Sequence, residues 1–564
     1  MDPKRLFKRL IPTLWEDDYL LAVAKPAGVD VGGQSERRSG GLIDLLCELR
    51  GGDETLTPIN RLSLYESGVL LLGKDPAIVE PLRANLRAGK IKQEFAAVVT
   101  GRMDRPRMEL VPRTTAPRRD EGRKAKGRNR PASRSQKTAT RTPRRQAGEP
   151  TTNVKSIKVG KGRTYVRCTT NVANTHALRA QLRGARLRLL GDGLHDRSRR
   201  PDRVELTCLH LAKMVFRHPA REVPITLTCR APMAIAGMVD GKRDVERPLA
   251  AALTRRLPCL MGRETNSFRL LTGRCENLRG LVAEKYGPVV ILEVREDSAA
   301  LKDSLRDIAR WYQDHLGVEA VLVKDIVGGA GGLDAEPSTG VRRVKPIVGM
   351  PVPSEVIVME RGLKFEIHPH AGRSVGLFLD QRENRRRVRE MAAGKSVLNL
   401  FAYTCGFSVA AAAGGASRTV SVDLAPGQLE WGKRNFALNG LDTSDQAFIR
   451  SDAAGYLKRA AREGTSFELI VIDAPTFAHA GKRGQSFSFV RDLPALVRGA
   501  SALLLADGIM LISTNNRALS MSRLKELVKQ GAGRRRFRVL ATPPLPLDFA
   551  VDPDHAKTMI LRFA

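Results

Sequence analysis

The sequence lacks the features of a membrane or secreted protein. No stretch approaches the roughly 18 to 20 uncharged apolar residues that cross a bilayer. The basic N-terminal stretch contains neither a hydrophobic core region nor a small-residue cleavage site. The seven cysteines form no CxxC pair, which disfavours a zinc ribbon and a disulfide framework. We therefore expect a cytoplasmic protein in a reducing compartment, with no membrane or metal partner.

Acidic and aromatic residues are also scarce. Aromatic residues make up 5% of the chain, and 60 Asp and Glu face 95 Lys and Arg, which leaves a formal net charge of +35. Such an excess of positive charge suits a polyanionic partner, and RNA or DNA is the first candidate. With 564 residues, 42% of them apolar, the chain is long enough for three or four domains with cores of their own.

The composition changes along the first half of the chain. Residues 12–101 alternate short apolar runs with Gly and Pro turns, which is typical of mixed β structure. Residues 113–145 carry 13 Lys or Arg, two acids and no aromatic residue, which is too little apolar surface to fold. We expect a disordered basic insertion over 102–150, acting either as a phosphate-binding tether or as a solvated linker. Globular composition then continues from about residue 153 to 232.

Five blocks in the first half follow one another in the order found in a known enzyme family. KPAGVDV, NRLSLYESGVLLLGK, KQEFAAVVTG, THALRAQLRGARLRLLGD and LHLAKMVFRHP resemble the pseudouridine synthases that modify large-subunit rRNA and tRNA, over residues 12–232. The family motif is His-Arg-Leu-Asp, whose aspartate is catalytic, and the matching residues here are Asn60, Arg61, Leu62 and Ser63. The aromatic residue near that aspartate matches Phe95, which has no hydroxyl.

The presence of Ser63 in place of the aspartate bears on activity. A serine hydroxyl is a far poorer nucleophile and proton acceptor than a carboxylate at neutral pH. The resemblance therefore implies a synthase fold that has lost its catalytic acid and is kept for RNA docking. An alternative is that Glu66, three residues along the turn, replaces the aspartate and that pseudouridylation is retained.

The second half contains a β-α-β pattern. Residues 396–403 predict a buried strand, residues 404–407 a tight turn, and residues 408–416 a small-residue helix before a second strand that ends at Asp423. An acid at the tip of the second strand is where nucleoside cofactors present ribose hydroxyls. Because there is no GxGxxG, NAD and FAD fit less well than S-adenosylmethionine, which has no pyrophosphate. A structural Rossmann domain is the alternative.

Further strand ends add polar side chains to the same crevice. FIRSD places Asp452 after a third short strand, where it can reach an adenine amino group, and FELIVIDAPTF places Asp473 at the tip of a central strand. Ligands of such sheets bind over the carboxyl ends of the strands, so we expect Asp423, Asp452 and Asp473 to converge. Asn515 and Asn516 end another strand, where they either hold a base edge or close a turn.

The expected fold is a multidomain α/β and α+β chain. A small α+β domain is predicted over 263–350, preceded by a linker over 233–262 and followed by a Rossmann-like domain over 351–564. TNSFRLLTGRCENLRGLVAEKYG and LFLDQRENR resemble the cytosine-C5 enzymes among the class I methyltransferases of bacterial 23S rRNA. LEWGKRNFALNGL, IDAPTFAHAGKR, ISTNNR and PLDF are more similar to the guanine-N7 enzymes of that group.

This resemblance implies two sets of site residues. The residues implied to bind S-adenosylmethionine are Gln381, Arg382, Phe401, Tyr403, Gly406, Asp423 and Asp452. The residues implied to face the target base are Asp473, Pro475 and Phe477. The sequence departs from the family at Cys405, where glycine is usual, and at Ala474, where the first proline of Asp-Pro-Pro stands.

Cysteine content separates the two subgroups. Cytosine C5 becomes nucleophilic only after a thiolate adds to C6, but no cysteine follows Cys405, which is itself expected to face the methionine part of the cofactor. Guanine N7 already carries an exposed lone pair and needs mainly alignment with the methyl group. The sequence therefore favours a guanine-N7 methyltransferase acting on 23S rRNA or the large ribosomal subunit. The alternatives are a C5 enzyme, an inactive RNA-binding or assembly factor, and a bifunctional enzyme.

Overall fold

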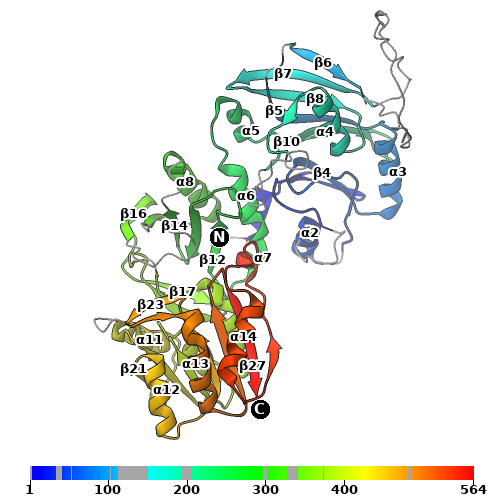
Figure 1. Cartoon of the computed structure of the whole chain (residues 1–564). Helices are drawn as coiled ribbons and strands as arrows, with labels where there is room; N and C mark the ends of the chain where they lie inside the picture. The colour runs from blue at the N-terminus through cyan, green and yellow to red at the C-terminus, as the bar shows by residue number, and fades with distance from the viewer. Residues whose placement is uncertain are drawn as a thin grey trace, which may run out of the picture. The chain divides into compact units, whose positions relative to one another are not determined.

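The computed structural model divides the chain into two compact units (Figure 1). The front unit holds the described residues between 10 and 247, and the rear unit holds residues 3–9 and the described residues from 248 onward. The structure describes residues 3–32, 41–52, 54–101, 103, 105–111, 150–192, 206–295, 301–326, 341–372, 374–480 and 485–564.

One mixed sheet forms the front unit. Its strands are β1 (Thr13–Glu16), β2 (Leu20–Lys25), β3 (Thr57–Pro58), β4 (Ser67–Gly73), β5 (Lys92–Thr100), β6 (Arg107–Leu110), β7 (Thr152–Gly160), β8 (Arg163–Thr170), β9 (Arg188–Leu189), β10 (Leu209–Arg217) and β11 (Pro224–Thr228). The strand order is β1-β2-β4-β10-β5-β8-β7-β6, with β3, β9 and β11 paired at its sides. Every residue of β4 is buried, because β4 lies between antiparallel β2 and parallel β10.

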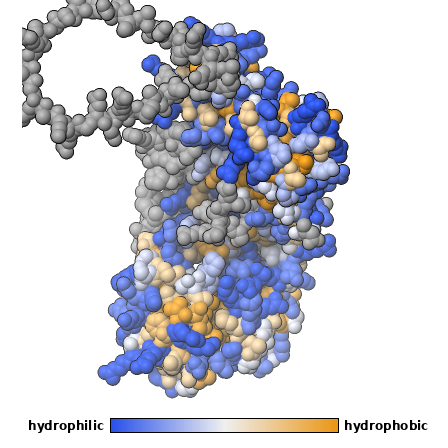
Figure 2. Space-filling model, turned by 90° about the vertical axis from the view of Figure 1, so that its right-hand side faces the viewer, coloured by the Kyte–Doolittle hydropathy of each residue, from blue (hydrophilic) through white to orange (hydrophobic). Residues whose placement is uncertain are grey.

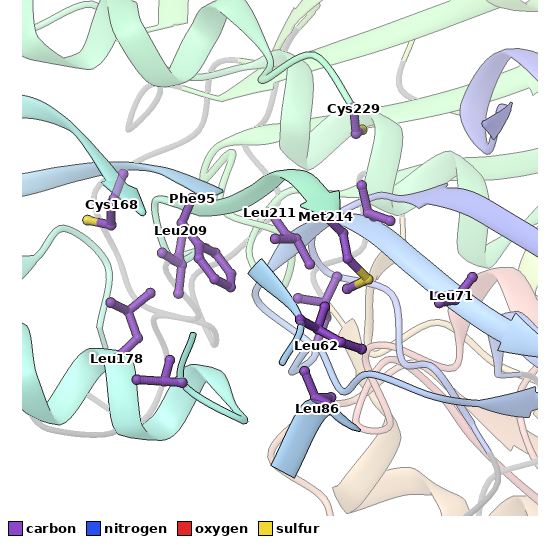
Figure 3. Packing of buried hydrophobic residues seen from close by; sticks show 14 of the residues in the cluster. Leu62, Leu71, Leu86, Phe95, Cys168, Leu178, Leu209, Leu211, Met214 and Cys229 are labelled. Carbon is purple, nitrogen blue, oxygen red and sulfur yellow. The ribbon is translucent and has the colours of Figure 1, made fainter. Parts of the chain in front are cut away.

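Helices cover part of this sheet and begin at side-chain caps. They are α2 (Leu42–Arg50), α3 (Pro76–Arg87) and α4 (Thr175–Gly184). The Asp75 side chain accepts a hydrogen bond from the first turn of α3, and the Asn174 side chain does the same for α4, which satisfies backbone N–H groups that have no partner within the helix. The core beneath them packs Phe95 with Leu178 and Leu209 (Figure 3). The mixed β structure expected from the sequence is confirmed.

Two segments differ from what the sequence predicted. Residues 107–110, the start of the expected disordered insertion, form strand β6, which pairs with β7; residues 112–149 lie outside the described part of the chain. The expected linker over 233–262 is helical, with α5 (Met233–Gly237), η1 (Met238–Asp240), α6 (Glu246–Arg255) and α7 (Leu257–Met261). The reason is that Leu249 and Leu253, one helical turn apart on α6, are both fully buried.

The rear unit begins with a small sheet of order β12-β13-β14-β15-β16. The elements of this region are β12 (Ser267–Thr272), β13 (Leu281–Tyr286), β14 (Val289–Arg295), α8 (Leu305–Leu316), β15 (Ala320–Ile326) and β16 (Val341–Gly349), followed by the hairpin β17 (Val356–Glu360) and β18 (Leu363–Ile367). Tyr286 and Leu322 of this sheet share one hydrophobic core with Phe365 of the hairpin. The α+β region was therefore predicted correctly in kind, while its boundary at residue 350 stays a prediction.

A seven-stranded sheet forms the rest of the rear unit. Its strands are β19 (Ser396–Leu400), β20 (Arg418–Asp423), β21 (Gln446–Arg450), β22 (Phe467–Asp473), β25 (Leu504–Thr514), β26 (Phe537–Ala541) and β27 (Lys557–Phe563). The order is β21-β20-β19-β22-β25-β27-β26, parallel from β21 to β25 and antiparallel beyond. The chain reverses its winding between β19 and β22, the place where open α/β sheets bind their ligands.

Helices cover both faces of this sheet (Figure 1). They are α9 (Arg382–Met391), α10 (Gly406–Ala413), α11 (Pro426–Leu438), α12 (Ala453–Arg462), α13 (Phe489–Leu503) and α14 (Met521–Ala532), with short turns η3 (Leu379–Gln381) and η5 (Leu547–Phe549) and the hairpin β23 (Phe477–Ala480) and β24 (Gln485–Ser488). One core contains residues of α12, α13 and α14, and another contains residues of α9 and α10. This layered α/β arrangement confirms the expected Rossmann-like fold.

Figure 2 shows a face on which hydrophilic residues surround smaller hydrophobic areas. Within the described ranges, no helix has the length and apolar character needed to cross a bilayer.

Candidate cofactor and substrate pocket

A cavity of about 1310 Å³ lies where the parallel strands of the rear sheet end. It exceeds the roughly 300–1,000 Å³ typical of small-molecule sites, so it has room for a cofactor together with part of a second ligand. Eight of the ten predicted site residues line it: Gln381, Phe401, Tyr403, Gly406, Asp423, Asp452, Asp473 and Pro475. Asn515 also lines the cavity. The predicted convergence of the three strand-end acids is therefore correct.

The turn from β19 into α10 is strained. Phe401, Tyr403 and Cys405 all have a positive φ, of 59°, 49° and 60°, and a residue other than glycine in this region costs on the order of 1–3 kcal/mol. The turn is held by hydrogen bonds from Ala402 N to Val422 O (3.0 Å) and from Tyr403 N to an oxygen of Asp423 (2.8 Å). Such strain concentrates at ligand sites, and this turn lines the cavity.

Asp423 and Asp452 both have acceptor capacity left for a ligand. The two Asp423 oxygens accept from Tyr403 N and from Ala425 N (2.9 Å). One Asp452 oxygen accepts from Gly455 N (2.7 Å), which caps α12. A carboxylate offers about four acceptor positions, so each side chain can still bind hydroxyl or amino groups. A Cβ at residue 455 would lie 2.7 Å from the Asp452 carboxylate, so a larger residue there would require this side chain to shift.

Asp473 lies beside a second carboxylate that the sequence did not single out. Burial, and then the charge of Asp380, raise the pKa of Asp473 to about 7. Burial also acts on Asp380, but a contact with His555 (3.5 Å) outweighs it and holds the pKa of Asp380 below its ordinary value. The two acids therefore differ in protonation near neutral pH, which is common where a site tunes one group against another.

Two predicted residues do not line the cavity. Arg382 is turned away because its guanidinium pairs with Asp548 and donates to Ser267 O (3.1 Å), so it joins elements of the rear unit instead of contacting a cofactor there. Phe477 lies on β23 with 40% of its surface exposed. Arg385, one helical turn after Arg382, lines the cavity in its place.

Arg385 and Phe487 are lining residues that the sequence reasoning missed. Arg385 donates to both oxygens of Glu360 (2.7 Å each) and to Phe378 O (2.7 Å). The ring of Phe487 lies 5.2 Å from that of Phe401. Helical spacing from Arg382 could have pointed to Arg385, whereas nothing local to residues 485–488 marks Phe487 as a pocket residue.

Cys405 does not face the cavity. Its side chain is fully buried, and it packs against Gly432 of α11, where an added Cβ would lie 2.3 Å from the sulfur. Burial raises the pKa of this thiol to about 12, so it stays protonated at neutral pH. The expectation that Cys405 faces the cofactor is wrong, because its side chain packs against α11 and does not line the cavity.

The turn that replaces the synthase motif in the front unit is closed by its own contacts. The hydroxyl of Ser63 is buried and has no hydrogen-bond partner among the described residues. Glu66 is fully buried; its carboxylate contacts Arg179 (3.1 Å) and accepts from Thr175 Oγ1 (2.9 Å) and Ser63 N (2.8 Å). Lys25 donates to the carbonyls of Ser63 (3.1 Å) and Glu66 (2.7 Å). The Glu66 carboxylate is thus engaged in holding the turn.

One cluster among the described residues has metal-ligand geometry. Glu355, Glu366 and His368 have ligand atoms within 4.8 Å of one another. Arg434 already neutralises Glu366 at 2.8 Å, and His368 contacts the same carboxylate at 2.7 Å. This cluster is therefore a compensated ion-pair group.

The parallel sheet, the strand-end acids and the strained turn from β19 into α10 are together typical of a Rossmann-like domain that binds a nucleoside cofactor. The sequence matches the S-adenosylmethionine-dependent methyltransferase family over residues 344–562 and the RNA pseudouridylate synthase family over residues 19–183. Both expected families and the expected cofactor class are confirmed.

The chain is similar in sequence to several ribosomal RNA large subunit methyltransferases. It is 43% identical over 170 residues to ribosomal RNA large subunit methyltransferase K of Neisseria meningitidis, which covers 30% of this chain and 48% of that protein. It is 31% identical over 307 residues to the putative ribosomal RNA large subunit methyltransferase YwbD of Bacillus subtilis, with 53% and 74% covered. A Deinococcus radiodurans ribosomal RNA large subunit methyltransferase is 30% identical over 326 residues, with 56% and 78% covered.

The chain therefore belongs to the same S-adenosylmethionine-dependent methyltransferase family as these relatives, although it spans only about half the length of the first of them. A solved structure of a putative methyltransferase complexed with SAH has the same fold, with a TM-score of 0.50 and 24% identity over 63% of this chain and 88% of that one.

Proposed function

We propose that the protein transfers a methyl group from S-adenosylmethionine to a guanine N7 of 23S ribosomal RNA. The observation that carries the proposal is the pocket itself, in which a strained turn and three strand-end acids line one cavity of about 1310 Å³. The net charge of +35 suits an RNA substrate. The names of the relatives support large-subunit rRNA.

The residues fit the cofactor. Asp423 keeps acceptor positions for ribose hydroxyls, Asp452 keeps them for an amino group, and Gly406 leaves room beside the turn, since an added Cβ would lie 3.3 Å from Arg385. When bound, S-adenosylmethionine supplies an electrophilic methyl group on a sulfonium. Phe401 and Tyr403 add aromatic surface to the lining of the pocket.

The position of Cys405 separates guanine N7 from cytosine C5. A C5 enzyme needs a thiolate at the base, yet none of the residues that line the pocket is a cysteine, and the Cys405 thiol is buried against α11. Guanine N7 carries its own lone pair, so the protein needs only to align the ring with the methyl group. These observations favour N7 over C5.

Asp473 is the residue we assign to the target base. Its carboxylate lines the pocket, and an ionised carboxylate can accept hydrogen bonds from the two donors on the Watson–Crick edge of guanine, an edge that adenine does not offer. The same negative charge offsets the positive charge that the ring gains when N7 is methylated. Pro475 lines the pocket beside it.

We assign the front unit to RNA docking without pseudouridylation. Ser63 cannot act as the catalytic acid, and Glu66 already binds Arg179 and Thr175 in the folded state. Release of tritium from RNA labelled at uridine C5 tests this assignment. The expected result is no release above a protein-free control, whereas release that disappears in Glu66→Ala would restore the bifunctional alternative.

Two measurements test the proposed function. Calorimetry with S-adenosylhomocysteine and the full chain should detect binding, and incubation of 23S rRNA with methyl-labelled S-adenosylmethionine should yield 7-methylguanosine after digestion to nucleosides. Binding without any methylated nucleoside would leave the methyl-transfer proposal wrong. Absence of cofactor binding would favour an inactive RNA-binding or assembly factor instead.

A further inference from the structure

Gln381 has its amide engaged by the protein. Its Nε2 donates to Ser513 Oγ (2.8 Å) and to Asp473 Oδ1 (3.3 Å), and its Oε1 accepts from Asn384 Nδ2 (2.6 Å). Only 4% of its surface is exposed. A glutamine amide has two N–H donors, and both are directed at protein acceptors. Gln381 therefore has no donor left for the cofactor that the sequence led us to expect it to bind.

The contacts of Gln381 belong to a closed ring of hydrogen bonds. Asn384 Nδ2 also donates to Thr558 Oγ1 (2.8 Å), and Thr558 Oγ1 donates to Ser513 Oγ (3.3 Å). The four side chains come from η3, α9, β25 and β27, and all are buried. A buried polar network whose members satisfy one another is rigid, because any rotation leaves a group without a partner.

Two donors of this ring make hydrogen bonds to the Asp473 carboxylate. Gln381 donates to Asp473, and the hydroxyl of Ser513 also hydrogen-bonds the Asp473 carboxylate. The other charged groups near this carboxylate are Asp380, which repels its charge, and Arg385, which attracts it. Ring donors favour the ionised carboxylate and fix its orientation.

We propose that Gln381 is a positioning residue for Asp473 and not a cofactor contact. The ring formed with Asn384, Ser513 and Thr558 fixes the Gln381 amide, and the amide fixes the carboxylate toward the target base. This inference rests on the proposed function, in which Asp473 holds the base. It predicts that substitutions at Gln381 change kcat and the pKa of Asp473 but do not change the affinity for the cofactor.

The test compares two isosteric glutamine-to-glutamate changes in the full-length protein. Gln381→Glu keeps the acceptor for Asn384 but replaces the donor to Asp473 with a third negative charge. Gln446→Glu is the matched control: Gln446 lies on β21, accepts from Thr419 N (2.8 Å) and Thr419 Oγ1 (2.6 Å), and does not line the pocket. Gln381→Met removes the hydrogen bonds without adding charge.

With 23S rRNA as substrate, Gln381→Glu should lower kcat at least tenfold and shift the acid limb of the pH profile toward alkaline pH, with the Kd for S-adenosylhomocysteine changed less than twofold. Gln381→Met should lower kcat by a similar factor and shift the acid limb in the same direction by a smaller amount, because it removes the donor to Asp473 without adding a charge. Gln446→Glu should match the wild type. A tenfold weaker Kd at an unchanged kcat would make Gln381 a cofactor contact and overturn the proposal, as would an unchanged kcat in both variants.

A second readout needs no substrate. The pKa of Asp473 can be obtained by measuring, as a function of pH, the difference in unfolding free energy between the protein with Asp473 and the variant Asp473→Asn. In the Gln381→Glu background this pKa should be higher by about one unit. If Gln381→Glu does not fold, Ser513→Ala can be used instead. This change removes the other hydrogen bond to the Asp473 carboxylate and should also raise the pKa of Asp473. An unmoved titration refutes the positioning role, whereas a wild type that binds no S-adenosylhomocysteine refutes the proposed function.

Discussion

Replacing Asp473 by asparagine tests the electrostatics of the pocket with little change in shape. Burial, followed by the charge of Asp380, raises the pKa of Asp473 from 3.8 to about 7. A shift of about three units corresponds to at most ~4 kcal/mol. Because the side chain lines an open pocket, solvent screening reduces this, and we expect roughly 2 kcal/mol.

The direction in which Asp473 changes the stability with pH depends on whether the folded or the unfolded state holds the proton. Between about pH 4 and pH 7 the unfolded chain has lost the Asp473 proton while the folded protein retains it, so this group lowers the stability as the pH rises through that window. Below the window both states are protonated and the penalty is absent; above it both are ionised and the penalty is complete. Asp473→Asn should therefore match the wild type near pH 4 and be more stable by ~2 kcal/mol at pH 8.

Thermal unfolding followed by tryptophan fluorescence measures this difference. The chain has three tryptophans, and a Trp15→Phe background leaves Trp311 and Trp431, both in the rear unit. The variant should gain about 4 °C in Tm over the wild type at pH 8 while losing methyl transfer, which is the usual conflict between stability and function at a strained site. A difference in Tm that does not change with pH would refute the assigned titration.

Three further variants test separate parts of the site. Asp423→Ala should weaken S-adenosylhomocysteine binding in calorimetry by roughly 10- to 100-fold, since it removes ribose acceptors and the support of the turn; an unchanged Kd contradicts the ribose assignment. Cys405→Ala should keep methyl transfer within about threefold and lower stability by about 1 kcal/mol, whereas complete loss of transfer would favour a cytosine-C5 enzyme. Glu66→Gln should destabilise the front unit by roughly 3 kcal/mol in urea unfolding, because Arg179 loses one of its buried partners; an unaltered midpoint means that this pair does not hold the turn.

The acids at the strand ends of the rear unit could be predicted because the sequence pattern that marks them is local. Each acid follows a run of apolar residues, and parallel strands end at one edge of the sheet, so Asp423, Asp452 and Asp473 had to lie close together. The small α+β region and the mixed front sheet followed from the same alternation of apolar runs and turns, whereas the order of the strands in each sheet was not predicted.

The contacts that the sequence did not reveal depend on partners far along the chain. Arg382 turns to Asp548, a residue 166 positions away, and no local pattern announces that pairing. Cys405 does not line the pocket, because its side chain packs against Gly432 of α11, a helix later in the chain. Gln381 lines the pocket as predicted, but the ring that engages its amide is completed by β25 and β27, far along the chain. The segment 233–262 was read as a linker because its short helices are interrupted by Pro and Gly.

The most direct test of the central claim is a map of 23S rRNA methylation in cells with and without the gene, by mass spectrometry of digested rRNA. The account predicts that one 7-methylguanosine disappears with the gene, returns with the wild-type gene, and does not return with Asp423→Ala. An unchanged methylation map, or the loss of 5-methylcytidine or of a pseudouridine in place of 7-methylguanosine, would contradict it.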